Sequence, residues 1–298
     1  MSTIKTLAQL EMQLGECPRW NEQEESWYWV DILGKALYRY DTLNKKLFSR
    51  IFDFNPACFA FTKTNQIILT ASSGLFLLEN FSSAVQFIMD PESDQPTQRF
   101  NDGVPTPDGN LLAGTIGDAT TATGNLYYFD ITKNSVICET IMEGYTIING
   151  QAFSPDGKWL YITDTPKQKI LKYPYNSTTK KLGKAQLFYK FTQEDEYPDG
   201  AAVDAEGNYW IAMYGTGKIC VISPEGEKID EIYLPISQPT MIAFGGINLN
   251  QLIVTSAAQG LNKESLEKEP LAGSVLLLDI SKKGALPFKL NTYKPSAN

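Results

Sequence analysis

The chain has 298 residues, of which 43% are hydrophobic and 12% aromatic, so it can bury a full core. Its net charge of −8 argues against a nucleic-acid partner, because no basic stripe is present to displace counterions from phosphates. It contains no histidine, which excludes a Ser-His-Asp triad, a Cys-His pair, a His-ligated zinc site and a histidine general base.

The N-terminal segment, residues 1–18, lacks the apolar stretch of a signal peptide, and no apolar span long enough to cross a bilayer follows it. We therefore expect a cytoplasmic protein without a membrane partner. A first strand is expected near residues 4–11, and one or two helical turns near 264–269. The four cysteines are scattered, with no C-x-x-C pair, and are expected to be free and mostly buried thiols.

A unit made of an apolar strand, a turn and a second apolar strand recurs along the chain. The strands after the turns are predicted at residues 27–32, 66–72, 110–116, 158–165, 208–214 and 251–257. The positions five residues before each turn are Glu16, Ala57, Asn101, Asn149, Asp199 and Thr240, which are 41, 44, 48, 50 and 41 residues apart. A repeat of this length built from short strands is typical of a β-propeller.

This spacing predicts an all-β fold, a six-bladed β-propeller of four-stranded antiparallel blades, as a single domain over residues 1–298. The ring closes best if the first strand, near Ile4–Glu11, pairs with strands from the C-terminal end, because that leaves no exposed edge inside the ring.

Equivalent positions of all blades lie on one ring around the axis of a propeller, and four of the six are acidic or amide residues: Glu16, Asn101, Asn149 and Asp199. Oxygen donors without nitrogen or sulfur suit a hard divalent cation. The alternative is that each side chain only bonds to backbone amides of its own turn. The matched register, and the lack of a turn motif at Glu16, favour a shared site. Asp102 is expected to lie behind the ligands rather than to be one.

Several segments are distinctive in order and spacing: LGECPRW, RFNDGVPTPDGNLLAGT, INGQAFSPDGKWLYITDT and PDGAAVDAEGNYWIAMYGTGKI. Over essentially the whole length, the chain resembles the gluconolactonase/regucalcin family of six-bladed propellers. The resemblance implies one divalent ion held by Glu16, Asn149 and Asp199, with Ca²⁺ as first choice and Zn²⁺, Mn²⁺ or Mg²⁺ as substitutes. It also implies that Asp199 is the general base, and that Arg99 and Asn101 contact substrate hydroxyls or metal-bound solvent.

One departure from the family pattern follows the GTI segment. Animal members carry two acidic residues after the corresponding segment, whereas this chain has Gly117, Asp118 and Ala119. Either Asp118 takes over the substrate contact, or the sugar specificity differs. The small, polar loop 117–125 is interpreted either as a flap over the site or as a plain surface loop.

The function predicted by these features is metal-dependent hydrolysis of a small sugar lactone such as glucono-1,5-lactone. The metal would polarise the carbonyl, and Asp199 would activate the attacking water. Metal-bound hydroxide remains a competing nucleophile, because a carboxylate bound to a dication is a weak base. Two alternatives stay open: a calcium-binding regulatory or protein-interaction propeller without catalysis, and a related metal-dependent esterase or phosphotriesterase. A small lactone is the only partner expected, with no obligate protein partner.

Overall fold

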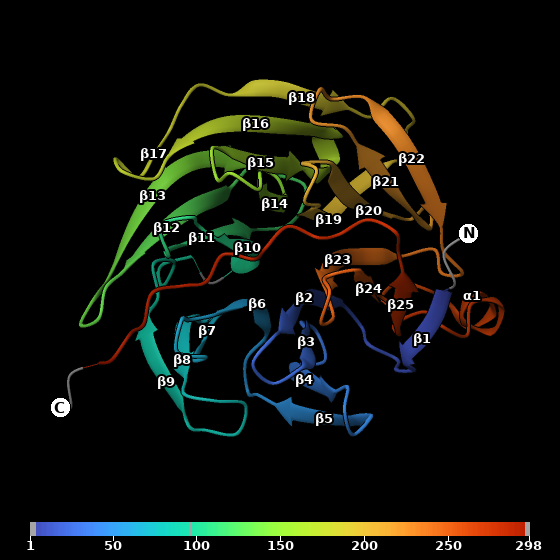
Figure 1. The fold of residues 1–298 in the computed structure, drawn as a ribbon, viewed down its shortest axis with the longest axis horizontal. Coiled ribbons are helices and arrows are strands. Elements are labelled where there is room, and N and C mark those ends of the chain that lie inside the picture. The colour runs from blue at the N-terminus through green and yellow to red at the C-terminus, as the bar shows by residue number, and fades with distance from the viewer. Residues whose placement is uncertain (1–3, 96, 296–298) are drawn as a thin grey trace.

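The computed structural model describes residues 4–95 and 97–295, and it is a six-bladed β-propeller (Figure 1). The first strand of each blade lies nearest the centre, and the following strands are added outward in chain order, except that β1 from the N-terminus completes the last blade. Blade 1 consists of β2 (Gly15–Asn21), β3 (Ser26–Asp31), β4 (Ala36–Asp41) and β5 (Lys46–Ile51). Blade 2 consists of β6 (Pro56–Phe61), β7 (Ile67–Ala71), β8 (Gly74–Leu78) and β9 (Val85–Met89). Blade 3 consists of β10 (Arg99–Pro105), β11 (Leu111–Ile116), β12 (Gly124–Ile131) and β13 (Val136–Tyr145).

The second half of the ring continues in the same way. Blade 4 consists of β14 (Ile148–Phe153), β15 (Trp159–Asp164), β16 (Lys169–Asn176), β17 (Lys181–Leu182) and β18 (Gln186–Lys190). Blade 5 consists of β19 (Tyr197–Val203), β20 (Tyr209–Tyr214), β21 (Lys218–Ile222) and β22 (Lys228–Tyr233). Blade 6 consists of β23 (Pro239–Gly245), β24 (Gln251–Ser256), β25 (Val275–Asp279) and β1 (Ile4–Ala8). Blade 4 differs from the rest, because β17 and β18 both pair with β16 and share its outer edge.

The ring closes through the two ends of the chain. β1 runs antiparallel to β25, with Ile4 opposite Leu278 and Thr6 opposite Leu276. The predicted pairing of the first strand with the C-terminal strands is confirmed, although the strand ends at Ala8 rather than near residue 11. Blade 6 is thus built from both termini, and none of its inner strands is left with an open edge.

The six strands predicted from apolar runs all form, within about two residues of their expected bounds. They are the second strands of the blades, and both of their faces are covered by neighbouring blades. All residues of β3, β7 and β11 are buried. Burial on both faces explains why these strands have nearly continuous apolar sequences instead of alternating ones.

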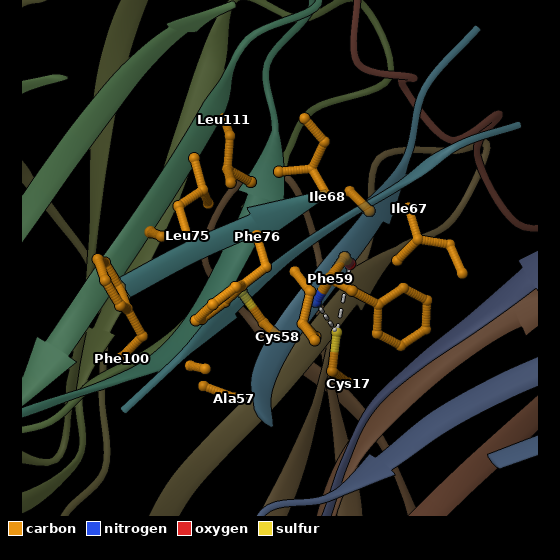
Figure 2. Packing of buried hydrophobic residues seen from close by; sticks show 14 of the residues in the cluster. Cys17, Ala57, Cys58, Phe59, Ile67, Ile68, Leu75, Phe76, Phe100 and Leu111 are labelled. Atoms are coloured by element: carbon orange, nitrogen blue, oxygen red, sulfur yellow. Dashed lines mark hydrogen bonds between the residues drawn. The ribbon is translucent and has the colours of Figure 1, made fainter. Parts of the chain in front are cut away.

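Aromatic and aliphatic side chains fill the spaces between blades. Figure 2 shows such a cluster between the first three blades, where the rings of Phe59, Phe76 and Phe100 pack among leucines and isoleucines. The Cys17 thiol joins two blades there, because its Sγ accepts a hydrogen bond from Phe59 N (3.1 Å) and donates one to Phe59 O (3.5 Å). All four cysteines are free, and three are buried, as expected.

Two shorter elements differ slightly from their predictions. The helix α1 (Lys263–Lys268) begins one residue earlier than expected, and the Asn262 side chain caps it by accepting from Ser265 N. A 3₁₀ turn, η1 (Thr165–Lys167), follows β15. The loop predicted at 117–125 ends at Thr123, because Gly124 already belongs to β12. Among the described residues, no helix is long and apolar enough to cross a membrane.

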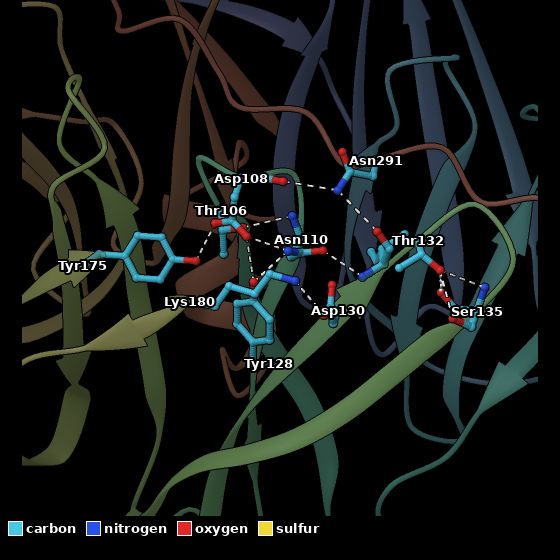
Figure 3. A network of polar contacts seen from close by, with 11 residues as sticks. Thr106, Asp108, Asn110, Tyr128, Asp130, Thr132, Ser135, Tyr175, Lys180 and Asn291 are labelled. Atoms are coloured by element: carbon cyan, nitrogen blue, oxygen red, sulfur yellow. Dashed lines mark hydrogen bonds and ion pairs between the residues drawn. The ribbon is translucent and has the colours of Figure 1, made fainter. Parts of the chain in front are cut away.

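The C-terminal strap, residues 283–294, crosses the propeller over the central channel (Figure 1, red). It binds the far ends of the inner strands, for example through Ala285 N to Val203 O (3.2 Å) and Leu290 N to Phe61 O (3.0 Å). Asn291 Nδ2 donates to Asp108 O and Ile131 O in blade 3, where Asp108 is itself part of a polar network (Figure 3). The strap therefore covers the end of the channel at which the inner strands finish.

Candidate functional site

The ring of equivalent positions lies where each inner strand breaks its pairing. β2, β6, β10, β14, β19 and β23 all shift register against their second strands, and each contacts the inner strands of both neighbouring blades. The shifts fall at Glu16/Arg19, Pro56/Phe59, Phe100/Gly103, Asn149/Ala152, Pro198/Ala201 and Pro239/Ile242. A β-bulge redirects the side chain that it carries. Six matched bulges therefore place the ring residues at the start of the inner strands, opposite the end covered by the strap.

Two of the ring residues are followed by a left-handed residue. Cys17, after Glu16, has φ 49°, and Gly150, after Asn149, has φ 58°. A Cβ at Gly150 would collide with the hydroxyls of Tyr209 and Thr163, so a larger side chain is excluded there by space as well as by conformation. Both bulges thus carry a left-handed residue directly after the ring position, and only the one after Glu16 has no turn motif in the sequence.

Amide contacts join blade 3 to blade 4. Asn101 Nδ2 donates to Asn149 Oδ1 at 2.6 Å and to Ile148 O at 3.2 Å. Arg99 Nη1 donates to Asn101 Oδ1 and to Phe100 O, both at 2.9 Å. The structure thus brings together three of the residues predicted from sequence.

A second set of contacts joins blade 4 to blade 5. Asn149 Nδ2 donates to Thr165 Oγ1 at 2.9 Å, and Thr165 Oγ1 donates to Pro198 O at 2.7 Å. Pro198 directly precedes Asp199, which is only 8% exposed. Asn149 is 5% exposed, so its amide is held by protein on both sides. The position of Asn149 is consequently tied to that of Asp199.

Negative charge is concentrated at this end of the channel. Burial, followed by the charges of Asp199 and Asp102, raises the pKa of Glu16 well above its ordinary value. Burial, followed by the charge of Asp102, raises the pKa of Asp199 well above its ordinary value, while Arg99 opposes the rise. The carboxylates from blades 1, 3 and 5 therefore lie within electrostatic reach of one another, and each makes it harder for the others to ionise.

Two arginines offset part of this charge. Arg19 lowers the pKa of Asp102, although burial of Asp102 is the larger effect and raises it. Arg19 also donates to Gly103 O at 2.8 Å, which fixes it across the channel from its own blade. When ionised, the carboxylates of Glu16, Asp102 and Asp199 carry three negative charges, and the guanidinium groups of Arg19 and Arg99 carry two positive ones. The remaining negative charge would become positive on binding of a divalent cation.

The predicted ligand set fits a hard cation. Glu16 and Asp199 would supply two carboxylates that repel each other, and Asn149 Oδ1 keeps a lone pair beside the one that accepts from Asn101. Among residues 4–95 and 97–295, no three Asp, Glu, Cys or His side chains form a metal-binding group by themselves. The predicted set accordingly includes the amide of Asn149. The assignment of Glu16, Asn149 and Asp199 as metal ligands stays a prediction.

Asp118 is placed differently from the other candidates. Its exposed carboxylate accepts four hydrogen bonds, from the backbone and hydroxyl groups of Thr120 and Thr121 (2.8–3.0 Å). These bonds lower the pKa of Asp118 below its ordinary value. The loop begins beside the site, because Ile116 is the strand partner of Arg99. Ala119 has a left-handed backbone, φ 64°. A substrate role for Asp118 stays a prediction, and in this structure its carboxylate holds its own loop.

Two residues near the site were not predicted from the sequence. Thr165 is the last residue of the INGQAFSPDGKWLYITDT segment and lies in η1, but no role was assigned to it, because its contact with Pro198 O comes from a neighbouring blade. Tyr214, the last residue of β20, is partly buried, and its pKa is raised by burial and by the charges of Asp199 and Glu16. Asp102 was expected behind the ligands, and it is buried there, accepting from Gly103 N at 2.7 Å. The sequence feature that pointed to Asp102 was its position directly after the ring residue Asn101.

A separate cavity of about 150 Å³ lies further along the inner strands. It is lined mainly by apolar side chains, such as Ala152, Ala201 and Met241, and by Leu286 and Phe288 of the strap. None of the predicted site residues lines it. This cavity is therefore distinct from the ring of polar residues.

The fold and the ring define a class of protein: a six-bladed propeller with buried carboxylates and amides at one end of its channel. The profile described as "SMP-30/Gluconolactonase/LRE-like region" matches residues 14–258. The chain belongs to this family.

Individual relatives agree with this assignment. The chain is 33% identical over 285 residues to 6-deoxy-6-sulfogluconolactonase from Pseudomonas putida, which covers 95% of this chain and 96% of the relative. It is 30% identical to regucalcin from Gallus gallus, over 93% of this chain and 94% of the relative. Among solved structures, a calcium-binding protein, regucalcin, from Agrobacterium tumefaciens superposes with a TM-score of 0.91, at 28% identity and 98% coverage of both chains.

Proposed function

We propose that the chain is a divalent-metal-dependent lactonase that hydrolyses a small sugar lactone. The observation that carries the proposal is the convergence of Glu16, Asn149 and Asp199, from three blades, at one end of the channel. Membership of a family that includes a relative named as a sugar-acid lactonase supports this chemistry.

Glu16, Asn149 and Asp199 would hold the ion, and Ca²⁺ is the first choice because all donors are oxygen. Zn²⁺, Mn²⁺ or Mg²⁺ are substitutes. When bound, such an ion polarises the carbonyl oxygen of the lactone.

Asp199 would accept a proton from the attacking water. As the water oxygen bonds to the carbonyl carbon, the ring C–O bond breaks, and the proton passes to the released alkoxide, giving a hydroxy acid. Without a metal ion, burial raises the pKa of Asp199 well above its ordinary value, and a bound dication would oppose this rise, so the proton-accepting role of Asp199 has to be tested at saturating metal.

Arg99 would orient the substrate. Only its Nη1 is bound, to Phe100 O and Asn101 Oδ1, and within the described residues its Nη2 and Nε have no protein partner. These donors can reach hydroxyl groups of a sugar ring. The oxygen and the nitrogen of the Asn101 amide both bond within the protein, so Asn101 holds Arg99 and Asn149 in place. Asn101 would also contact the substrate. Asp118 would reach the substrate after its loop opens.

The test is hydrolysis of glucono-1,5-lactone near pH 7 by the full chain, before and after metal removal, against the uncatalysed rate. We expect activity to disappear with chelator and to return with an added divalent ion. Glu16→Ala, Asn149→Ala and Asp199→Ala should fall to background, whereas Asp130→Ala, which loses an exposed ion pair, should not. Near-normal activity in all three site variants would overturn the site.

A second candidate function is calcium binding without catalysis, which is favoured by the relatives named regucalcin. It predicts binding of Ca²⁺ with no turnover of any lactone. A substrate panel that adds an aryl ester and a phosphotriester separates both of these functions from a metal-dependent esterase or phosphotriesterase.

A further inference from the structure

Four side chains and one carbonyl form a continuous hydrogen-bond chain across three blades. It runs from Arg99 and Asn101 in blade 3, through Asn149 and Thr165 in blade 4, to Pro198 O in blade 5. The successive distances are 2.9, 2.6, 2.9 and 2.7 Å.

The two ends of this chain fix its direction. A guanidinium group can only donate, so Arg99 must give its proton to the oxygen of Asn101. Asn101 then presents Nδ2 to Asn149, whose oxygen must accept. A carbonyl can only accept, so the Thr165 hydroxyl gives its single proton to Pro198 O. Thr165 Oγ1 is left as an acceptor, and it can bond only to the Nδ2 of Asn149.

Both ends of the chain therefore impose the same orientation on the Asn149 amide. Its oxygen faces Asn101, and its nitrogen faces Thr165. The opposite orientation would place two NH₂ groups together at Asn101 and two acceptors together at Thr165. Such unpaired buried groups are costly, because Asn149 and Thr165 are only 5% and 8% exposed.

We infer that Thr165 is a positioning residue for the metal ligand Asn149, acting through its hydroxyl group. The inference rests on the proposed function, in which Asn149 Oδ1 binds the ion. Because the same hydroxyl bonds to the carbonyl next to Asp199, Thr165 also sets the spacing between two ligands on different blades. Partners that orient a ligand in this way commonly change metal affinity about 10- to 100-fold when they are lost.

The test compares Thr165→Val, which keeps the shape and loses the hydroxyl, with Thr165→Ser, which keeps the hydroxyl. Calcium and manganese affinities are measured by titration calorimetry on the full chain, together with thermal stability, kcat and KM. We expect Thr165→Val to bind either ion about 10- to 100-fold more weakly, and Thr165→Ser to stay within a few-fold of wild type. Activity of Thr165→Val should recover when the ion is raised to saturation.

Thr106→Val is the matched control. Thr106 is buried like Thr165, and its hydroxyl accepts from Asn110 N at 2.9 Å, at the far end of an inner strand. It should lower thermal stability without changing metal affinity. If Thr165→Val does not fold, Thr165→Ala removes the same hydroxyl and is compared with Thr165→Ser in the same way.

The outcomes separate the two proposals. Wild-type protein that binds no divalent ion overturns the proposed function, and with it this inference. Wild-type protein that binds an ion, with unchanged affinity in Thr165→Val, overturns the inference alone. Equal weakening in Thr165→Ser and Thr165→Val would do the same, because retaining the hydroxyl would then give no advantage and any change of side chain at this position would disturb the ligand.

Discussion

Asn101 Nδ2 lies 2.6 Å from Asn149 Oδ1, although 48 residues separate the two in the chain. The contact couples a residue expected to face the substrate to a residue expected to bind metal. Asn101 is therefore expected to influence the proposed metal site even before any substrate is present. Substitutions at Asn101 should be visible in metal binding as well as in turnover.

Asn101→Ala should weaken metal binding modestly and lower kcat less than Asp199→Asn does. The variant removes one hydrogen bond to a ligand, and it leaves all three ligands and the proton acceptor in place. Calorimetric titration with Ca²⁺ and steady-state kinetics on the same preparation measure both effects. A variant with wild-type metal affinity would show that the contact with Asn149 does not orient the ligand.

Asp199→Asn should keep the ion with weakened affinity while kcat falls about 10²- to 10⁴-fold, the usual contribution of a positioned base. The amide retains an oxygen donor and the size of the side chain but has no basicity. Kinetics must be measured at saturating metal, so that loss of the ion is not mistaken for loss of the base. Near-normal turnover at saturating metal would show that a group other than Asp199 accepts the proton.

Metal binding should release protons, and its stabilising effect should grow with pH. Without a cation, burial and neighbouring negative charge raise the folded-state pKa values of Glu16 and Asp199 above their ordinary values of 4.5 and 3.8. The stability contributed by these raised values is fully present below the ordinary pKa values, and it is lost as pH rises through the folded ones. The metal-free protein is thus destabilised at pH values above the ordinary pKa values of these two carboxylates. The ion binds only when both carboxylates are ionised, so it stabilises the protein more as pH rises.

Calorimetry in buffers of different ionisation enthalpy, between about pH 5 and 8, measures the released protons. Glu16→Gln, which has no proton to lose, should release fewer than wild type. A binding heat that is the same in every buffer, together with a metal-induced rise in Tm that does not change with pH, would contradict the expected linkage.

Ala119→Glu should change the ranking among lactones through KM, with little gain in kcat on the preferred one. A new contact to a distant hydroxyl is worth about 1–3 kcal/mol, and the ion and Asp199 are untouched. Ala119 already has a left-handed backbone, so Ala119→Asn, which tolerates that conformation, is a useful companion variant. An unchanged ranking across a lactone panel would show that position 119 does not face the substrate.

The fold could be predicted because its signals are local and repeated. Continuous apolar runs marked the second strands, whose faces are covered on both sides, and a recurrence every 41 to 50 residues marked the equivalent positions of the ring. The shared outer edge of blade 4 could not be predicted in this way. Residues 177–185 there are mostly polar, and β17 is only two residues long, so the segment gives no strand pattern.

The site was predictable only to the level of single residues. Spacing placed Glu16, Asn101, Asn149 and Asp199 on one ring, and the structure brings them together. The contacts between them depend on how adjacent blades stack, which no local pattern encodes. Thr165 was missed for this reason. The turn in which Asp118 accepts from Thr120 and Thr121 was missed because the sequence of a short polar loop does not determine which acceptor its threonines bind.

Closure of the ring by β1 has a consequence for how the protein is made. Lys5 and Asp279, which form an ion pair across β1 and β25, are 274 residues apart. The first strand therefore leaves the ribosome long before its partner exists, and blade 6 stays incomplete until synthesis is nearly finished. Until then, β1 has no neighbour, and the sides of blades 1 and 5 that face blade 6 are uncovered, which leaves the nascent chain open to misassociation. A chain arrested shortly before β25 should for this reason depend on chaperones far more than the full-length product.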